Sequence, residues 1–149
     1  MTPPDPTDAE IRDLLARMRV VAVVGASANP ERASHAVARV LQRRGIAVIP
    51  VNPRHAGETI LGEPVVARLD AIPPERGAVD TVDIFRRADQ AGTAVDEAIA
   101  ALAPRGLRTI WMQLGVVDTA AAARARAAGL DVVMDRCPAI EWRRLDGAS

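Results

Sequence analysis

The sequence lacks tyrosine and lysine altogether, and two tryptophans and one phenylalanine make aromatic residues only 2% of its 149 positions. The core must therefore be built from alanine, valine, leucine and isoleucine, which suits helices packed on a parallel sheet. The absence of lysine excludes lysine-based catalysis. All 19 basic residues are arginine, balanced by 19 acidic residues, so we expect no nucleic acid and no membrane as partner.

Cysteine is also scarce, since Cys137 is the only one. A single thiol excludes an internal disulfide and a cysteine-cluster metal site, and it is typical of a reducing compartment. The first ten residues show no secretory signal pattern, and no apolar run approaches the ~20 residues that span a bilayer. We therefore predict a soluble, cytoplasmic protein.

The length predicts one domain over residues 1–149, with loose tails at 1–6 and 146–149. Apolar runs that indicate strands alternate with segments of helical spacing. The predicted strands are 20–24, 46–51, 79–85, 107–112 and 130–134. One predicted helix begins at a Thr7 capping box and a second lies between the first strand and Gly45. Two more are predicted at 93–102 and 118–128. Residues 54–74 are expected to form an irregular connection with room for one short helix. This order predicts an α/β, Rossmann-like, doubly wound parallel five-stranded sheet with helices on both faces.

In such a sheet the ligand lies at the carboxyl ends of the strands. Each predicted strand ends in a polar or glycine-bearing corner. These corners are Gly25-Ala26-Ser27, Asn52-Pro53-Arg54, Phe85-Arg86-Arg87, Gln113-Leu114-Gly115 and Asp135-Arg136-Cys137. Their convergence on one rim predicts a binding site there.

The first corner follows the apolar run 20–24 and resembles a phosphate-binding turn. Ser27 and Pro30 stand where the dinucleotide fingerprint has its second and third glycines, so the motif alone is weak. Its N–H groups and the Ser27 hydroxyl suit a pyrophosphate at a helix N-terminus. A plain tight turn capped by Ser27 is the alternative.

The second corner has no acid to accept hydrogen bonds from ribose hydroxyls, and Arg54 and His55 stand there instead. Cations suit a phosphorylated ribose, which NADP carries at the 2′ position and coenzyme A (CoA) at the 3′ position. Arg86 is a second candidate for phosphate. Gln113 could hydrogen-bond a pantetheine or nicotinamide amide, or could instead satisfy loop backbone.

Signs of catalysis are missing. No metalloprotease, Walker A, nucleophile-elbow or acidic metal motif occurs, so we assign no catalytic residue and no metal ligand. His35 is expected to cap a helix, and Cys137 is expected to be a buried inert thiol. The sequence therefore favours binding over transformation.

At these corners the sequence resembles a known family. The segments VAVVGASANPERASHAV, VIPVNPR, LGEPV, VDIFRRAD, WMQLGV and VVMDRCP, in order from about Val20 to Leu145, look like the small stand-alone CoA-binding domain proteins. That family is similar to the CoA-binding domain of the succinyl-CoA synthetase α subunit. The resemblance implies a CoA or acyl-CoA ligand.

The resemblance also implies which residues hold that ligand. It places phosphate at the first turn and Arg32, adenosine and the 3′-phosphate at the second corner, and pantetheine along the later corners. The implied set is Gly25, Ala26, Ser27, Arg32, Val51, Asn52, Pro53, Arg54, Ile84, Phe85, Arg86, Gln113 and Gly115. The synthetase's phosphohistidine domain has no counterpart here, so we expect a non-catalytic CoA-binding protein. We also expect a homodimer, because short α/β domains often bury an alanine- and leucine-rich helix face between two copies. An NADP-dependent oxidoreductase and a regulatory interaction subunit are the alternatives.

Overall fold

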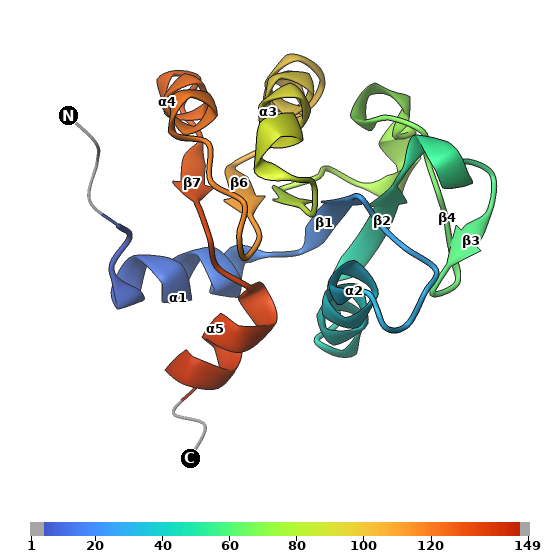
Figure 1. The fold of residues 1–149 in the computed structure, drawn as a ribbon, viewed down its shortest axis with the longest axis horizontal. Helices are drawn as coiled ribbons and strands as arrows, with labels where there is room; N and C mark the ends of the chain where they lie inside the picture. Colours follow the sequence, from blue (N-terminus) through green and yellow to red (C-terminus); the bar gives the residue numbers. More distant parts are fainter. Residues whose placement is uncertain (1–4, 147–149) are drawn as a thin grey trace.

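A computed structural model describes residues 5–146 and places one five-stranded parallel sheet between two layers of helices (Figure 1). The strand order is β2-β1-β5-β6-β7. The strands are β1 (Val20–Val24), β2 (Ala47–Val51), β5 (Thr81–Ile84), β6 (Thr109–Met112) and β7 (Asp131–Val133). The predicted fold class is confirmed, and the last four strands are shorter than the apolar runs that predicted them.

Five α-helices within residues 5–146 cover the sheet, three on one face and two on the other, as Figure 1 illustrates. The helices α1 (Asp8–Arg17), α2 (Ala33–Arg43) and α5 (Pro138–Leu145) share one face, and α3 (Ala88–Leu102) and α4 (Thr119–Ala127) share the opposite face. The predicted capping box is confirmed, because Thr7 Oγ1 accepts from the N–H of Glu10 while Glu10 Oε1 accepts from the N–H of Thr7, both at 3.1 Å.

Two helices differ from the sequence prediction. Helix α3 begins at Ala88 rather than at residue 93, because Gly92 lies inside the helix and interrupts its apolar pattern. Helix α5 was not predicted; it has only eight residues and begins at Pro138. Proline fits the first turn of a helix, where its missing N–H has no intrahelical partner.

The connection from β2 to β5 is more regular than predicted. It contains the antiparallel hairpin β3 (Thr59–Ile60) and β4 (Glu63–Pro64), turned by Leu61 at φ +51° and Gly62 at φ +79°. Positive φ at both central residues suits a tight hairpin. Three short 3-10 helices complete it, at Pro53–His55, Leu69–Ala71 and Pro74–Arg76. The chain thereby crosses from one side of β1 to the other.

The connection also covers the free edge of β2. Pro50 pairs with Val23 of β1 on the inner side of the strand. On the outer side the N–H of Val66 donates to Pro50 O at 3.0 Å, and the N–H of Asn52 donates to Val66 O at 2.9 Å. The segment around Val66 therefore runs beside the end of β2.

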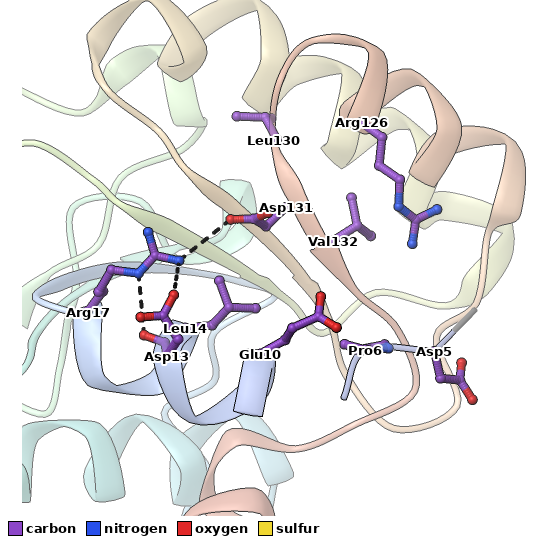
Figure 2. A pocket seen from close by; sticks show the side chains of 10 residues that line it. All are labelled: Asp5, Pro6, Glu10, Asp13, Leu14, Arg17, Arg126, Leu130, Asp131 and Val132. Carbon is purple, nitrogen blue, oxygen red and sulfur yellow. Dashed lines mark hydrogen bonds and ion pairs between the residues drawn. The ribbon is translucent and has the colours of Figure 1, made fainter. Parts of the chain in front are cut away.

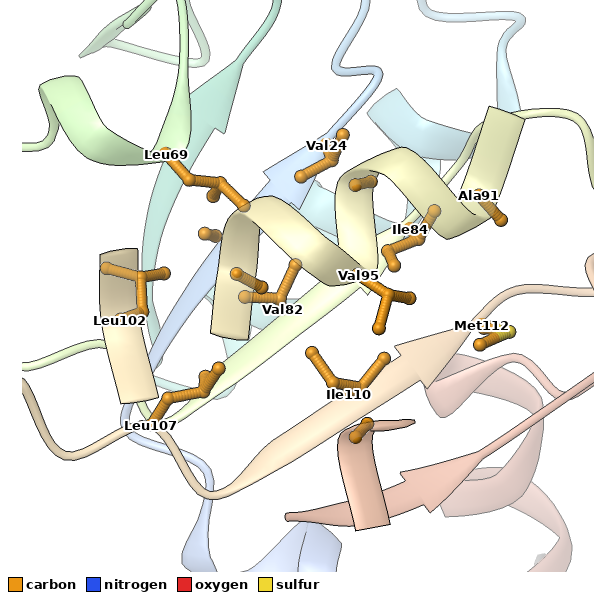
Figure 3. Packing of buried hydrophobic residues seen from close by; sticks show 14 of the residues in the cluster. Val24, Leu69, Val82, Ile84, Ala91, Val95, Leu102, Leu107, Ile110 and Met112 are labelled. Atoms are coloured by element: carbon orange, nitrogen blue, oxygen red, sulfur yellow. The ribbon is translucent and has the colours of Figure 1, made fainter. Parts of the chain in front are cut away.

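Alternate strand residues face the two helical layers. Val82 and Ile84 of β5 pack under α3, in the cluster that Figure 3 shows around Val95 and Ile110. Thr81 and Asp83 point to the other face, where Trp111 and the buried stripes of α1 and α2 pack. Parallel strands are buried on both faces, so Asp83 lies inside the protein and is only 1% exposed.

Ion pairs hold α5 in place. Glu141 is 5% exposed, and its Oε1 lies 2.7 Å from Arg136 Nη1 and 2.9 Å from Arg144 Nη2. Arg144 also pairs with Asp8 of α1 at 2.8 Å. Burial alone would raise the pKa of Glu141, but the hydrogen bonds from Arg144 and Arg136 outweigh it and hold the pKa below its usual value.

The predicted tails lie mostly outside the described residues, since 1–4 and 147–149 are not part of them. Asp146, the first residue of the predicted C-terminal tail, is the C-cap of α5 and pairs with Arg44 at 2.9 Å. The Arg44 guanidinium also lies 4.4 Å from the centre of a Trp142 ring. Between residues 5 and 146, no helix has the length and apolar character that crossing a bilayer requires.

Candidate functional site

The strand order reverses between β1 and β5, and their carboxyl ends form a crevice. Gly25 follows β1 at φ +87°, and a Cβ atom built there would lie 2.6 Å from Phe85 O. The N–H of Phe85 donates to Val24 O at 2.9 Å, which holds this approach in place. Glycine is therefore required at position 25 by both its dihedral angle and its neighbour.

The first turn differs in detail from a simple phosphate cradle. The N–H groups of Gly25 and Ala26 both donate to Val51 O, at 3.0 and 3.4 Å, so they are already used. Ser27 Oγ accepts from the N–H of Asn29 at 3.1 Å, so the hydroxyl shapes the turn. This geometry turns the first two amides of the corner toward β2.

Four N–H groups near this turn donate no hydrogen bond within residues 5–146. They belong to Ser27, Ala28, Ala33 and Ser34. The last two are the first residues of α2, where the helix dipole also favours an anion. His35 is the third residue of α2 and does not cap the helix. The N-cap is Arg32, which makes no side-chain capping bond.

Asn52 joins the first two corners. Its Nδ2 donates to Ala26 O at 2.9 Å, and its Oδ1 accepts from the N–H of Arg54 at 2.9 Å. Both ends of the amide are thus engaged by protein. Asn52 fixes the position of Arg54 relative to the first turn.

Three arginines of the predicted set stand at this edge without a carboxylate. Arg32 and Arg54 are exposed and Arg86 is half-buried. None of the three makes an ion pair or a side-chain hydrogen bond with any group in residues 5–146. His55 differs, because its Nδ1 lies 3.0 Å from Glu58 Oε2. Unpaired guanidinium groups suit bidentate contacts with phosphate.

A groove of about 410 Å³ opens at the same edge, between the β2 corner and α3. Val24, Val51 and Pro53 supply apolar lining, while Arg86 contributes a cation. Arg68, also in the lining, is paired with Asp70 at 3.0 Å. The groove lies at the switch of strand order, where α/β sheets bind ligands.

Several predicted residues reach the edge only with their backbone. The side chains of Ala26, Val51 and Ile84 are 2%, 3% and 0% exposed and pack in the core. Gly115 belongs to the corner after β6, where its N–H donates to Asp135 Oδ1 at 2.7 Å. Gln113 is 4% exposed, and its Oε1 has no hydrogen-bond partner.

Asp83 and the burial of His35 were missed by sequence reasoning. Asp83 Oδ1, Asp83 Oδ2 and His35 Nδ1 are buried without a hydrogen-bond partner. Burial raises the pKa of Asp83 well above its usual value. An acid inside a predicted parallel strand was the available signal, because such a strand is buried on both faces.

A second cavity, of about 460 Å³, lies at the amino end of β7 between α1 and α4 (Figure 2). Its lining carries four carboxylates and two arginines, and Arg17 already lies 2.7 Å from Asp13 and 3.8 Å from Asp131. A net acidic lining suits a phosphorylated ligand poorly. Within residues 5–146, no group of three histidine, cysteine or acidic side chains is arranged to hold a metal.

Comparison with known proteins gives one family and one fold. The family model described as "CoA binding domain" matches residues 19–143. The uncharacterized protein YneT of Bacillus subtilis is 36% identical over 133 residues, which cover 89% of this chain and 92% of that protein. The crystal structure of Prb, described as PH1109 protein redesigned for binding, is similar with a TM-score of 0.86 and 36% identity, over 97% of this chain and 96% of Prb. A Thermus thermophilus structure is similar with a TM-score of 0.84 and 34% identity, over 94% and 99%.

Proposed function

Because the chain belongs to the CoA-binding domain family, we propose that it binds CoA or an acyl-CoA at the carboxyl edge of the sheet, without acting as an enzyme. The observation that carries this proposal is the set of three unpaired arginines, Arg32, Arg54 and Arg86, around one strand switch. Each can meet phosphate without first breaking an ion pair among the described residues.

We assign the 3′-phosphate of CoA to Arg54. The Asn52 side chain holds the Arg54 backbone beside the first turn. Its Nδ2 donates to Ala26 O and its Oδ1 accepts from the N–H of Arg54, each at 2.9 Å. The pyrophosphate is assigned to the free N–H groups between Ser27 and Ser34, together with Arg32. The pantetheine arm then runs past Phe85 and Arg86 toward Gln113 and Gly115.

NADP is the competing ligand, because Arg54 suits a 2′-phosphate as well as a 3′-phosphate. The experiment is therefore a calorimetric titration with CoA, dephospho-CoA and NADP under one buffer condition. We expect CoA to bind more tightly than both others. Tighter NADP binding would favour the oxidoreductase, and no binding of any of the three would favour an interaction subunit.

Arg54→Ala sharpens the same titration. A charge-assisted hydrogen bond contributes about 1.5–3 kcal/mol, so we expect at least about tenfold weaker CoA binding and unchanged dephospho-CoA binding. Arg39→Ala is the matched control, an exposed arginine of α2 behind the turn. Equal losses for both ligands would contradict the placement of the 3′-phosphate.

Two remaining expectations are part of this proposal. A cytoplasmic location is supported by the single cysteine, Cys137, since scarce cysteine is typical of a reducing compartment. Pairing of two copies follows from alanine-rich helix faces that suit close packing. Light scattering over a range of protein concentrations tests the second expectation, and a constant monomer mass would contradict it.

A further inference from the structure

Three buried side chains on one side of the sheet keep polar atoms without partners. Asp83, Gln113 and His35 are 1%, 4% and 6% exposed. Both carboxyl oxygens of Asp83, Oε1 of Gln113 and Nδ1 of His35 make no hydrogen bond with the described residues. Buried polar groups are rarely left unpaired in native proteins, so each such group calls for a cause.

Strand register places two of these groups on neighbouring strands. Asp83 of β5 is opposite Trp111 of β6, and Gln113 is two residues beyond Trp111. The pairing continues past the strand end, because the N–H of Gln113 donates to Ile84 O at 3.2 Å. Residues two apart share a face, so Gln113 lies diagonally from Asp83, nearer the carboxyl edge.

The chemistry of the two groups is complementary only if Asp83 carries a proton. An ionised carboxylate and an amide oxygen are both acceptors, whereas a carboxylic acid has an O–H donor. Burial raises the pKa of Asp83, and no neighbouring charge contributes to this rise. The titratable groups buried on this face are His35 of α2, Cys137 before α5 and Glu141 of α5, while the side chains that α1 buries are apolar.

The two ends of the Gln113 amide differ in their surroundings. Oε1 is buried without a partner, whereas Nε2 is not among the buried unpaired atoms. An amide fixed in this orientation presents an N–H donor at the carboxyl edge. The pantetheine arm of CoA carries amide carbonyls that accept such a bond.

We propose that Asp83 is a positioning residue, protonated in the folded protein, whose O–H donates to Gln113 Oε1 and thereby aims Nε2 at the pantetheine arm. The ligand-facing part of this proposal rests on the proposed function. The buried donor itself does not, because it is a property of the protein without ligand. The two parts can therefore be tested separately.

Infrared difference spectroscopy tests the buried donor without CoA. The spectrum of the wild-type protein minus that of Asp83→Asn should contain the C=O stretch of a protonated carboxylic acid at neutral pH. A carboxylate band at neutral pH would overturn the proposal.

CoA titration tests the positioning role. Asp83→Ala removes the donor and should weaken CoA binding on the order of fivefold, whereas Asp83→Asn keeps an N–H donor and should stay within about twofold. Thr81→Val is the control, since Thr81 is 2% exposed on the same face of β5 but two residues farther from the edge. Wild-type affinity in the alanine variant, or equal losses in both Asp83 variants, would overturn the role.

The outcomes separate the two proposals. If Asp83 is protonated but the protein binds no CoA, the proposed function and the ligand-facing role of Gln113 are contradicted. The buried Asp83 donor is then still supported. CoA binding together with an ionised Asp83 would retain the proposed function and end this inference. Thermal unfolding of every variant confirms that a lost affinity is measured on folded protein.

Discussion

Glu141 and Asp83 are two buried carboxyl groups on the same side of the sheet, and their surroundings are opposite. Glu141 receives hydrogen bonds from Arg136 and Arg144, and its pKa is lowered. Asp83 receives none from the described residues, and its pKa is raised. Exposure does not separate them, at 5% and 1%. The number of hydrogen-bond donors around each carboxyl group therefore distinguishes Glu141, which helps to hold α5 in place, from Asp83, which has no such structural contact among the described residues.

The arginines divide in the same way. Around α5, Arg136 and Arg144 are paired with acids, whereas Arg54 and Arg86 at the carboxyl edge have no acidic partner within residues 5–146. A paired guanidinium has its electrostatic partner within the fold. Unpaired ones keep their full attraction for an incoming anion. The contrast between the α5 contacts and the carboxyl edge thus predicts stability effects at one and binding effects at the other.

Glu141→Ala should give the largest loss of stability. Removing one partner of fully buried ion pairs costs about 3–5 kcal/mol, but we expect about 2 kcal/mol here because water reaches the remaining cations. The side chains of Arg136 and Arg144 are 27% and 41% exposed. Urea unfolding measures the loss, with Glu75→Ala on an exposed turn as the control.

The pH dependence gives a second measure of Glu141. Its pKa is lowered on folding, so its stabilisation is present above its usual pKa of 4.5 and is lost as the pH falls through the folded value. Wild-type stability should therefore decline in acid more steeply than that of Glu141→Gln. Parallel acid curves would show that the two arginines do not act on Glu141.

Asp83→Asn should act in the opposite direction. The raised pKa of Asp83 means that the unfolded chain loses its proton first, so wild-type stability declines as pH rises from near 3.8 through the folded value. Each unit of pKa displacement contributes about 1.4 kcal/mol. Asparagine removes this dependence, and urea unfolding at neutral pH should show a more stable protein. A less stable variant would contradict a pKa of Asp83 that is raised by burial.

Arg44→Ala should have a smaller effect than either acid. It removes the cation lying 4.4 Å from the Trp142 ring centre, a contact of about 0.5–1 kcal/mol at partly exposed sites. It also removes the surface pair with Asp146. Thermal unfolding should show a small downward shift, and Arg44→Lys should recover part of it.

Arg86→Met should leave stability almost unchanged. Arg86 makes no ion pair with the described residues, and surface-type substitutions of this kind usually stay within about 0.5 kcal/mol. The same variant should weaken CoA binding, because Arg86 lines the groove at the strand switch. A variant that loses stability but retains affinity would reverse the comparison between the two regions.

The sequence was most informative where local rules decide structure. The Thr7 capping box and the strand before Gly25 were predicted to the residue, because each depends on neighbours within one turn or one strand. The hairpin turned by Leu61 and Gly62 was missed, since its strands have two residues each and carry no periodic signal. Short elements are stabilised by contacts with the rest of the fold, which one sequence does not display.

The candidate site shows the same limit. The residue types at the strand ends indicated a phosphorylated ligand, because parallel strands bring their carboxyl ends to one rim. Sequence alone did not reveal that Asn52 bonds to the first turn or that the Gly25 and Ala26 amides are used by Val51. These hydrogen bonds join segments that are far apart in the chain, so they emerge only with the tertiary structure.

The outer side of β2 also affects how the protein behaves among other chains. Along that side, Pro50 has no N–H to donate, while Pro50 O and the N–H of Asn52 are occupied by Val66. Among the described residues, Val48 is left as the residue of β2 whose N–H and C=O face outward without a backbone partner. A strand of another molecule would therefore find few free backbone groups along the outer edge of β2, which protects the sheet against edge-to-edge aggregation.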